Sequence, residues 1–114
     1  MKTIFILAAL LVANLGTAQE VKPKYEIIGQ EVKATFFYEN GQIKQEGNYL
    51  NGKPNGKWVS FNEDGSKKAI GEYTNGNKTG KWFFWSENTL SEVDFADQRI
   101  AEVKKWSKES LAKN

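Results

Sequence analysis

The sequence contains no cysteine and no histidine among its 114 residues. The absence of cysteine rules out a disulfide framework, so packing must stabilise the fold. The absence of histidine rules out histidine-based acid–base catalysis, Ser-His-Asp and Cys-His nucleophilic sites and most zinc sites. It also rules out nucleotidylyl transfer that depends on an H-x-G-H phosphate-binding motif. Composition alone therefore excludes most classes of enzyme.

A strong charge of either sign is also missing. The net charge is +2, and removal of residues 1–18, whose only charged side chain is Lys2, would leave +1. A nearly neutral protein has no electrostatic reason to bind nucleic acid or an acidic lipid surface. We therefore expect no nucleic-acid partner.

An unbroken apolar run from Ile4 to Val12 continues only to Leu15, with Asn14 breaking it, and so is shorter than the roughly 20 residues of a membrane-spanning helix. Lys2 precedes the run, and the small residues Gly16-Thr17-Ala18 follow it. This order predicts a signal peptide over residues 1–18, cleaved after Ala18. The alternatives are an uncleaved anchor or a buried N-terminal helix. No cysteine follows the run, so a lipoprotein anchor is excluded, and we expect a periplasmic or secreted single domain with no membrane span after cleavage.

The segment NGKPNGKW at residues 51–58 recurs as NGNKTGKW at residues 75–82, an offset of 24. A partial third copy follows, in which Phe95 takes the repeated tyrosine position only if two residues are deleted. Phe37, Phe61 and Trp85 are also equivalent. The other repeat positions are Gly41, Tyr49, Gly52, Gly56, Trp58, Gly65, Gly71, Tyr73, Gly76, Gly80 and Trp82. The repeat, the 13% aromatic content and the ten glycines favour an all-β protein.

Each repeat has the pattern of a β-hairpin. Asn40-Gly41 and Asp64-Gly65 are typical of type I′ turns, in which both central residues need a positive φ. A two-residue loop at Asp64-Gly65 predicts that Trp58 pairs with Gly71, so that the glycine leaves room for the Trp58 indole. The predicted register is completed by the pairs Val59 with Ile70, Lys57 with Glu72, Ala34 with Gly47 and Lys33 with Asn48. Residues 51–56 and 75–80 are then expected to be tight links between hairpins.

Strand alternation sorts the aromatic residues onto two faces. Trp82 and Phe84 share one face, and Phe83 and Trp85 share the other. One sheet cannot bury both faces unless it curls or is covered. The candidate covers are residues 24–32, read as a strand bent at Gly29, and residues 99–114. The latter are read as a strand to about Lys105 and a polar tail that is helical or frayed.

The pattern Y-x-N-G-x-x-x-G-x-W-x-x-aromatic, followed by Asn-Gly or Asp-Gly, resembles the bacterial variant of MORN repeats from about Thr35 to Arg99. The resemblance implies an elongated, twisted, single-layer antiparallel sheet of stacked hairpins. It also implies a scaffold or association surface, with lipid binding proposed for some members, and no agreed catalytic residues. Bacterial relatives are often labelled antitoxins, a role that fits an exported chain badly.

This organisation divides the chain into four parts. They are a signal peptide (1–18), an N-terminal strand segment (19–34), three hairpin repeats (35–99) and a C-terminal strand with its polar tail (100–114).

Candidate catalytic groups are few. Glu63-Asp64 lies at an expected turn, and Glu92 and Asp94 are expected to be solvated on an outer strand face. Asp97 near this pair lacks the dense ligand spacing of a calcium loop. The segment GKPNGKW has neither the glycine spacing nor the Ser/Thr of a phosphate-binding loop. We predict no catalytic, metal-binding or cofactor-binding residue.

The remaining candidate site is the aromatic cluster KWFFWSEN at residues 81–88. Flat aromatic rings are favoured at interfaces, so Phe83 and Trp85, with Phe61 and Trp106, are candidates for an interaction surface. Alternatively, Trp82 and Phe84 form the core while Phe83 and Trp85 pack beneath the tail, against Trp106. The sequence therefore predicts an exported, non-catalytic module that binds a protein partner. The alternative is binding of a glycan or lipid through the third hairpin, and a small hydrolase is a distant third.

Overall fold

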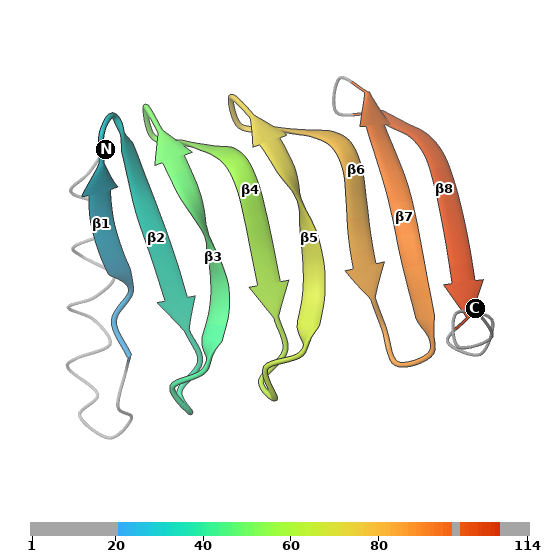
Figure 1. Ribbon diagram of the computed structural model, residues 1–114, viewed down its shortest axis with the longest axis horizontal. Coiled ribbons are helices and arrows are strands. Elements are labelled where there is room, and N and C mark those ends of the chain that lie inside the picture. The colour runs from blue at the N-terminus through green and yellow to red at the C-terminus, as the bar shows by residue number, and fades with distance from the viewer. Residues whose placement is uncertain (1–20, 97–98, 108–114) are drawn as a thin grey trace.

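The computed structural model describes residues 21–96 and 99–107. These residues form one eight-stranded antiparallel sheet in which every strand pairs with its neighbours in sequence (Figure 1). The strands are β1 (Lys24–Ile28), β2 (Glu31–Phe37), β3 (Ile43–Leu50), β4 (Lys53–Phe61), β5 (Lys67–Thr74), β6 (Asn77–Trp85), β7 (Thr89–Ala96) and β8 (Arg99–Ser107). The sheet is elongated, with extents of 50 × 32 × 23 Å. The predicted all-β, single-layer antiparallel fold is confirmed.

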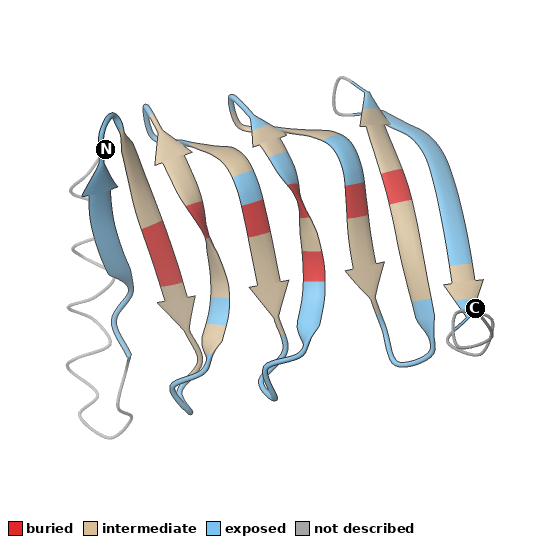
Figure 2. Ribbon diagram, viewed as in Figure 1, coloured by how far each residue is buried: buried red, intermediate tan, exposed pale blue. Residues whose placement is uncertain are grey.

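The core lies on one face of the sheet, which we call the tryptophan face. Figure 2 shows the buried positions as a band across the middle of β2 to β7. The buried apolar residues are Ala34, Trp58, Ala69, Trp82 and Val93. The rings of Trp58 and Trp82 belong to a chain of edge-to-face contacts, in the order Tyr49, Trp58, Tyr73, Trp82 and Phe95. The tryptophans therefore act as the centre of a core that a single layer would otherwise lack.

The predicted strand pairing is confirmed, but the location of the indole rings differs from the prediction. Trp58 pairs with Gly71. Its ring, however, lies over Gly47 on the preceding strand, and the ring over Gly71 is that of Trp82. Both rings turn back because β4 and β6 are irregular here and contain Gly56 (φ +83°) and Gly80 (φ +68°). The extra residues bend each strand and re-aim its tryptophan.

The turn types also differ from the prediction. Asn51-Gly52 and Asn75-Gly76 have positive φ at both positions, as in two-residue type I′ turns, and residues 53–56 belong to β4. At the other end of the sheet, Gly41 has a positive φ but Asn40 does not. There, the Tyr38 amide donates to the Gln42 carbonyl (2.9 Å) and the Gly41 amide to the Tyr38 carbonyl (3.0 Å). Asn40-Gly41 and Asp64-Gly65 therefore lie in three-residue loops rather than type I′ turns.

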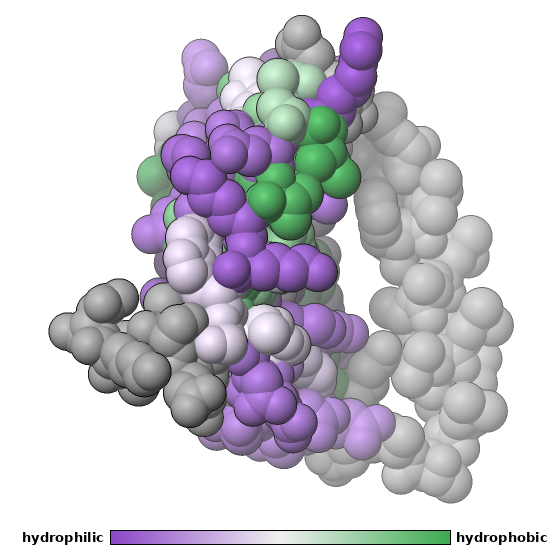
Figure 3. Space-filling view, turned by 90° about the vertical axis from the view of Figure 1, so that its right-hand side faces the viewer, coloured by the Kyte–Doolittle hydropathy of each residue, from purple (hydrophilic) through white to green (hydrophobic). Residues whose placement is uncertain are grey.

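The described parts of the two candidate covers, residues 24–32 and 99–107, extend the sheet instead of covering it. Residues 24–32 are not one bent strand, because Gly29 (φ +63°) lies in a turn between β1 and β2. β8 forms the opposite edge, and Figure 3 views the molecule from this side. The predicted signal peptide and the polar tail from residue 108 lie outside the described residues.

The third repeat has lost two residues, as predicted. Gly80 pairs with Phe95, whereas its equivalent Gly56 pairs with Tyr73. Val93 accordingly takes the place of Gly71 opposite a tryptophan. β7 therefore has a valine where the earlier repeats have a glycine covered by an indole.

Candidate functional site

The face opposite Trp58 and Trp82, which we call the open face, contains the four predicted interaction residues, Phe61, Phe83, Trp85 and Trp106. The strand registers place Val59, Ile70 and Phe83 in one cross-strand row. A second row contains Trp85, Leu90 and Trp106. It is displaced from the first row by two residues along β6, towards the loop that joins β6 to β7. All six side chains are partly exposed. No described residue forms a second layer over them, since the eight strands make one sheet.

Trp85 is the centre of this surface. Its ring lies 6.4 Å from that of Phe83, measured between centroids. Leu90 separates it from Trp106, so the direct Trp85–Trp106 contact considered from the sequence does not occur in the pairing. Leu90 was missed because the shortened third repeat hides its register. Trp85 pairs with Leu90 across the loop between β6 and β7. Recognising that loop in the sequence would therefore have placed Leu90 beside Trp85.

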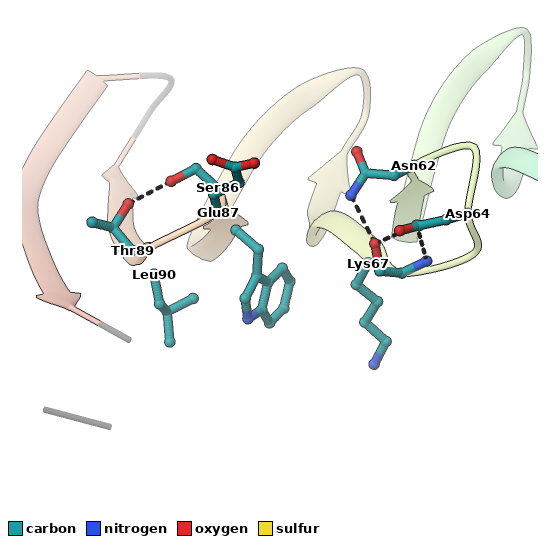
Figure 4. Close-up of a pocket in the computed structure, with 9 residues that line it drawn as sticks. Asn62, Asp64, Lys67, Ser86, Glu87, Thr89 and Leu90 are labelled. Carbon is teal, nitrogen blue, oxygen red and sulfur yellow. Dashed lines mark hydrogen bonds between the residues drawn. The ribbon is translucent and has the colours of Figure 1, made fainter. Parts of the chain in front are cut away.

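A depression beside Trp85 lies between two adjacent loops of the sheet and measures about 750 Å³. We call it the notch. Figure 4 shows the notch, with polar side chains from both loops around the indole. The lining residues are Asn62, Asp64, Ser66, Lys67, Trp85, Ser86, Glu87, Thr89 and Leu90. The notch thus combines one aromatic ring with amide, hydroxyl and charged groups.

The corresponding depression one repeat earlier is smaller, at about 350 Å³. There the Tyr38 hydroxyl donates to the Phe61 carbonyl (2.7 Å), and the side-chain amide of Asn40 donates to the Glu63 carbonyl (3.1 Å). These two bonds tie the first loop to the second. Asn62 stands 24 residues after Tyr38, and its shorter side chain bonds within its own loop to Ser66 (3.0 Å). The notch is therefore open because asparagine replaces tyrosine.

Hydrogen bonds fix the polar rim of the notch. Asp64 Oδ1 accepts bonds from the Ser66 hydroxyl (2.6 Å) and the Ser66 amide (2.9 Å). These bonds stabilise the carboxylate and hold the pKa of Asp64 below its ordinary value, with the hydroxyl bond the larger cause. The Ser86 and Thr89 hydroxyls lie 2.6 Å apart on the other side. The rim is therefore preorganised.

The other candidate carboxylates are held in a structural ion cluster. Glu92 bonds to Lys81 at 2.8 Å, and Asp94 lies 3.8 Å from the same ammonium group. The bond to Glu92 is the main reason that the pKa of Lys81 is raised. Glu92 was expected to be solvated, but only 13% of its side chain is exposed. Asp97 lies outside the described residues.

The described residues contain no group of three or more Asp and Glu side chains that could hold a metal ion. Within the described part of the chain there is also no helix with the length and hydropathy that crossing a membrane would require. The arrangement on the open face is suited to stacking and hydrogen bonding rather than to proton transfer, because its best-placed carboxylates already have partners.

Comparison with protein families agrees with the hairpin architecture. The model of the MORN repeat variant matches residues 30–51 and residues 54–75. The first segment contains β2 and β3, and the second contains most of β4 and all of β5. The two matches support a MORN-type repeat protein, and MORN repeats are generally interaction modules. Comparison with curated proteins gives no match.

Proposed function

We propose that this chain is an exported, non-catalytic module of the cell envelope that binds a protein partner on the open face of its sheet. The observation that carries the proposal is the partly exposed apolar surface formed by Val59, Ile70, Phe83 and the Trp85 row. Contiguous apolar surface of this kind is typical of interaction sites, and tryptophan is enriched among the residues that dominate binding energy. The signal-peptide pattern supports export.

The face itself supports a protein rather than a small molecule as the partner. The apolar rows extend across five strands, from β4 to β8, and the Lys81–Glu92 pair lies beside them. An apolar centre with charged residues at its margin is the usual composition of a protein interface. Because the strands fix the rows, binding would require little rearrangement.

The test is crosslinking in the envelope with tagged mature chain, followed by in vitro binding of the captured protein. The Phe83→Ser/Trp85→Ser variant is expected to weaken this binding by about tenfold or more. Ile27→Ser is the matched control, because it removes an apolar side chain that is 82% exposed but lies on the tryptophan face of β1. Circular dichroism establishes that both variants are folded. Equal binding by wild type and the double variant would refute the proposal.

A second candidate function, glycan binding, is favoured by the notch. The Trp85 ring lies beside hydroxyl, amide and carboxylate groups, a combination that can stack on a sugar ring and bond its hydroxyls. Phe37 and Phe61 are equivalent to Trp85 and lie two strands apart, roughly 10 Å from one to the next. An extended oligosaccharide could cross all three.

Asn62→Tyr separates the two candidates. The introduced hydroxyl is expected to bond the Trp85 carbonyl as Tyr38 bonds that of Phe61, and so to close the notch. Polysaccharide binding by the wild type that is lost in Asn62→Tyr would favour a glycan. Protein capture unaffected by Asn62→Tyr but lost in the Phe83/Trp85 variant would favour the open face.

A further inference from the structure

We propose that two copies of this chain associate through their β8 strands, in an antiparallel pairing centred on Val103. The inference concerns the edge of the sheet, so it is independent of the partner proposed for the open face. It starts from the place of β8, which is the last strand of the sheet and has no strand on its far side among the described residues. Such an edge exposes backbone groups that can pair with another strand.

β8 is suited to pairing along its length. It contains nine residues, with neither glycine nor proline. The large apolar side chains that are exposed in the described chain all lie on or next to the two edge strands: Val21, Tyr25, Ile27 and Ile28 at β1, and Ile100 and Val103 at β8. Figure 3 shows an apolar patch on the β8 side of the molecule, bordered by hydrophilic side chains. Ile100 is 61% exposed and Val103 is 47% exposed.

A second copy is the occupant because the sequence of β8 is complementary to itself in one register. If Val103 lies opposite Val103 of the second copy, Glu102 lies opposite Lys104 of that copy, and the reverse pair forms symmetrically. Opposite charges directly across a strand pair stabilise it. Among the described residues, neither Glu102 nor Lys104 forms an ion pair within the chain.

The neighbouring registers are unfavourable. In a two-fold symmetric antiparallel pairing whose opposed side chains lie on the same face, one residue lies at the centre, opposite the same residue of the second copy. Any other register of this kind therefore has a different residue at the centre. Centring on Glu102 places two carboxylates opposite each other, and centring on Lys104 or Lys105 places two ammonium groups opposite each other. Lysines on an edge strand normally discourage pairing. Of these registers, only the one centred on Val103 places a carboxylate of the second copy opposite Lys104.

The two-fold symmetry of this pairing determines how the sheets of the two copies are joined. Because directly opposed residues share a face, both copies present their open faces on the same side of one continuous sheet. The contact is closed, since the same strand is used by both copies. It involves one strand from each copy and little side-chain area, so association is expected to depend strongly on concentration.

The register is tested with Val103→Cys. The protein contains no cysteine, so any crosslink forms at the introduced position. Paired residues in antiparallel strands have Cα atoms about 4.5–5.5 Å apart, within the roughly 4.4–6.8 Å of disulfides. Mild oxidation should give mostly disulfide-linked dimer. Ile27→Cys is the matched control, since it places an exposed cysteine on the opposite edge and should remain largely uncrosslinked.

Charge reversal tests the same pairing without a covalent bond. Glu102→Lys or Lys104→Glu alone should raise the dissociation constant measured by analytical ultracentrifugation about tenfold, because both symmetric contacts become repulsive. Mixing the two variants should restore association, since one edge then carries two lysines and the other two glutamates. Thermal unfolding checks that both variants remain folded.

Three results would overturn the proposal. The first is a wild-type protein that stays monomeric at the highest soluble concentration. The second is unchanged association of both single variants. The third is weakening by Glu26→Lys equal to that by Glu102→Lys, which would indicate that β8 pairs with β1 of the next copy instead. None of these results depends on whether the open face binds a protein.

Discussion

The indole of Trp82 lies over the backbone of Gly71 on the neighbouring strand, and its Nε1 donates a hydrogen bond to the carbonyl of Glu72 at 3.0 Å. Trp58 has the same relationship to Gly47, with a 3.0 Å bond to the carbonyl of Asn48. The glycine removes the side chain that would hold the ring away from the sheet. A single layer thus gains two nearly buried indoles whose polar groups are satisfied.

The first prediction concerns this contact. A Cβ at Gly71 would overlap the atoms of the Trp82 ring, so Gly71→Ala must displace the indole or the strand. We expect the free energy of unfolding, measured in urea by circular dichroism, to fall by about 3 kcal/mol. Trp82→Ala alone should be destabilising by about 3–5 kcal/mol. In that background Gly71→Ala should have almost no effect, because the clash is gone. Additive losses in the double variant would contradict the overlap as the cause.

The second prediction separates the two kinds of turn. Asn75 has φ +53°, a conformation that asparagine and glycine tolerate and alanine does not. Asn75→Ala should therefore lower the free energy of unfolding by about 1 kcal/mol, whereas Asn75→Gly should be nearly neutral.

Asn40 provides the comparison, because its φ is not positive and its side chain accepts a bond from the Gln42 amide at 2.9 Å. Asn40→Gly should therefore be as harmful as Asn40→Ala, since both remove that bond. Equal responses of Asn40 and Asn75 to glycine would argue against the assigned turn types.

These turns mark where the sequence was informative and where it was not. The pairing of Trp58 with Gly71 followed from strand alternation and the loop position, and it was correct. The turn types were wrong because Asn-Gly or Asp-Gly occurs at both ends of the repeat. The choice between them depends on whether the Asx side chain bonds the amide two residues later, as it does for Asp64 and Ser66.

The candidate site was predictable to a similar degree. Alternation placed Phe61, Phe83 and Trp85 on one face, since a period of two needs no tertiary information. The notch was not predicted, because it depends on a difference between repeats rather than on their likeness. The Tyr38 hydroxyl reaches a carbonyl in the next loop, and no local pattern indicates such a bond.

The third prediction concerns acid stability. Hydrogen bonds from Ser66 hold the pKa of Asp64 below its usual 3.8. A depressed pKa in the folded state means that this carboxylate contributes stability above the unfolded-state value. That contribution is lost as the pH falls from about 3.8 through the lower folded-state value.

Ser66→Ala removes the larger of these bonds, so an NMR titration of the Asp64 carboxyl carbon should show its pKa rising towards the usual value. The dependence of stability on pH in this range should flatten accordingly. The matched control is Ser86→Ala, which removes a hydroxyl on the other side of the notch and should leave the Asp64 titration unchanged. A Ser66→Ala titration identical to that of wild type would show that the hydroxyl is not the cause.

The fourth prediction concerns the bond that ties successive loops together. Tyr38→Phe deletes the hydroxyl that donates to the Phe61 carbonyl at 2.7 Å and leaves the ring in place. The free energy of unfolding should fall by about 1 kcal/mol, with an unchanged dependence on urea, because one part-buried hydrogen bond is lost. Tyr25→Phe is the control, since the Tyr25 hydroxyl is exposed and has no hydrogen-bond partner among the described residues.

The same pair of variants reports on how the repeats cooperate. If the Tyr38 bond couples the first loop to the second, amide exchange in residues 62–66 should accelerate in Tyr38→Phe, although the substitution lies 24 residues away. Tyr25→Phe should leave that exchange unchanged. Faster exchange confined to residues 38–42 would mean that each loop is stabilised by its own hydrogen bonds, and that the closed first depression is a consequence of packing rather than of this bond.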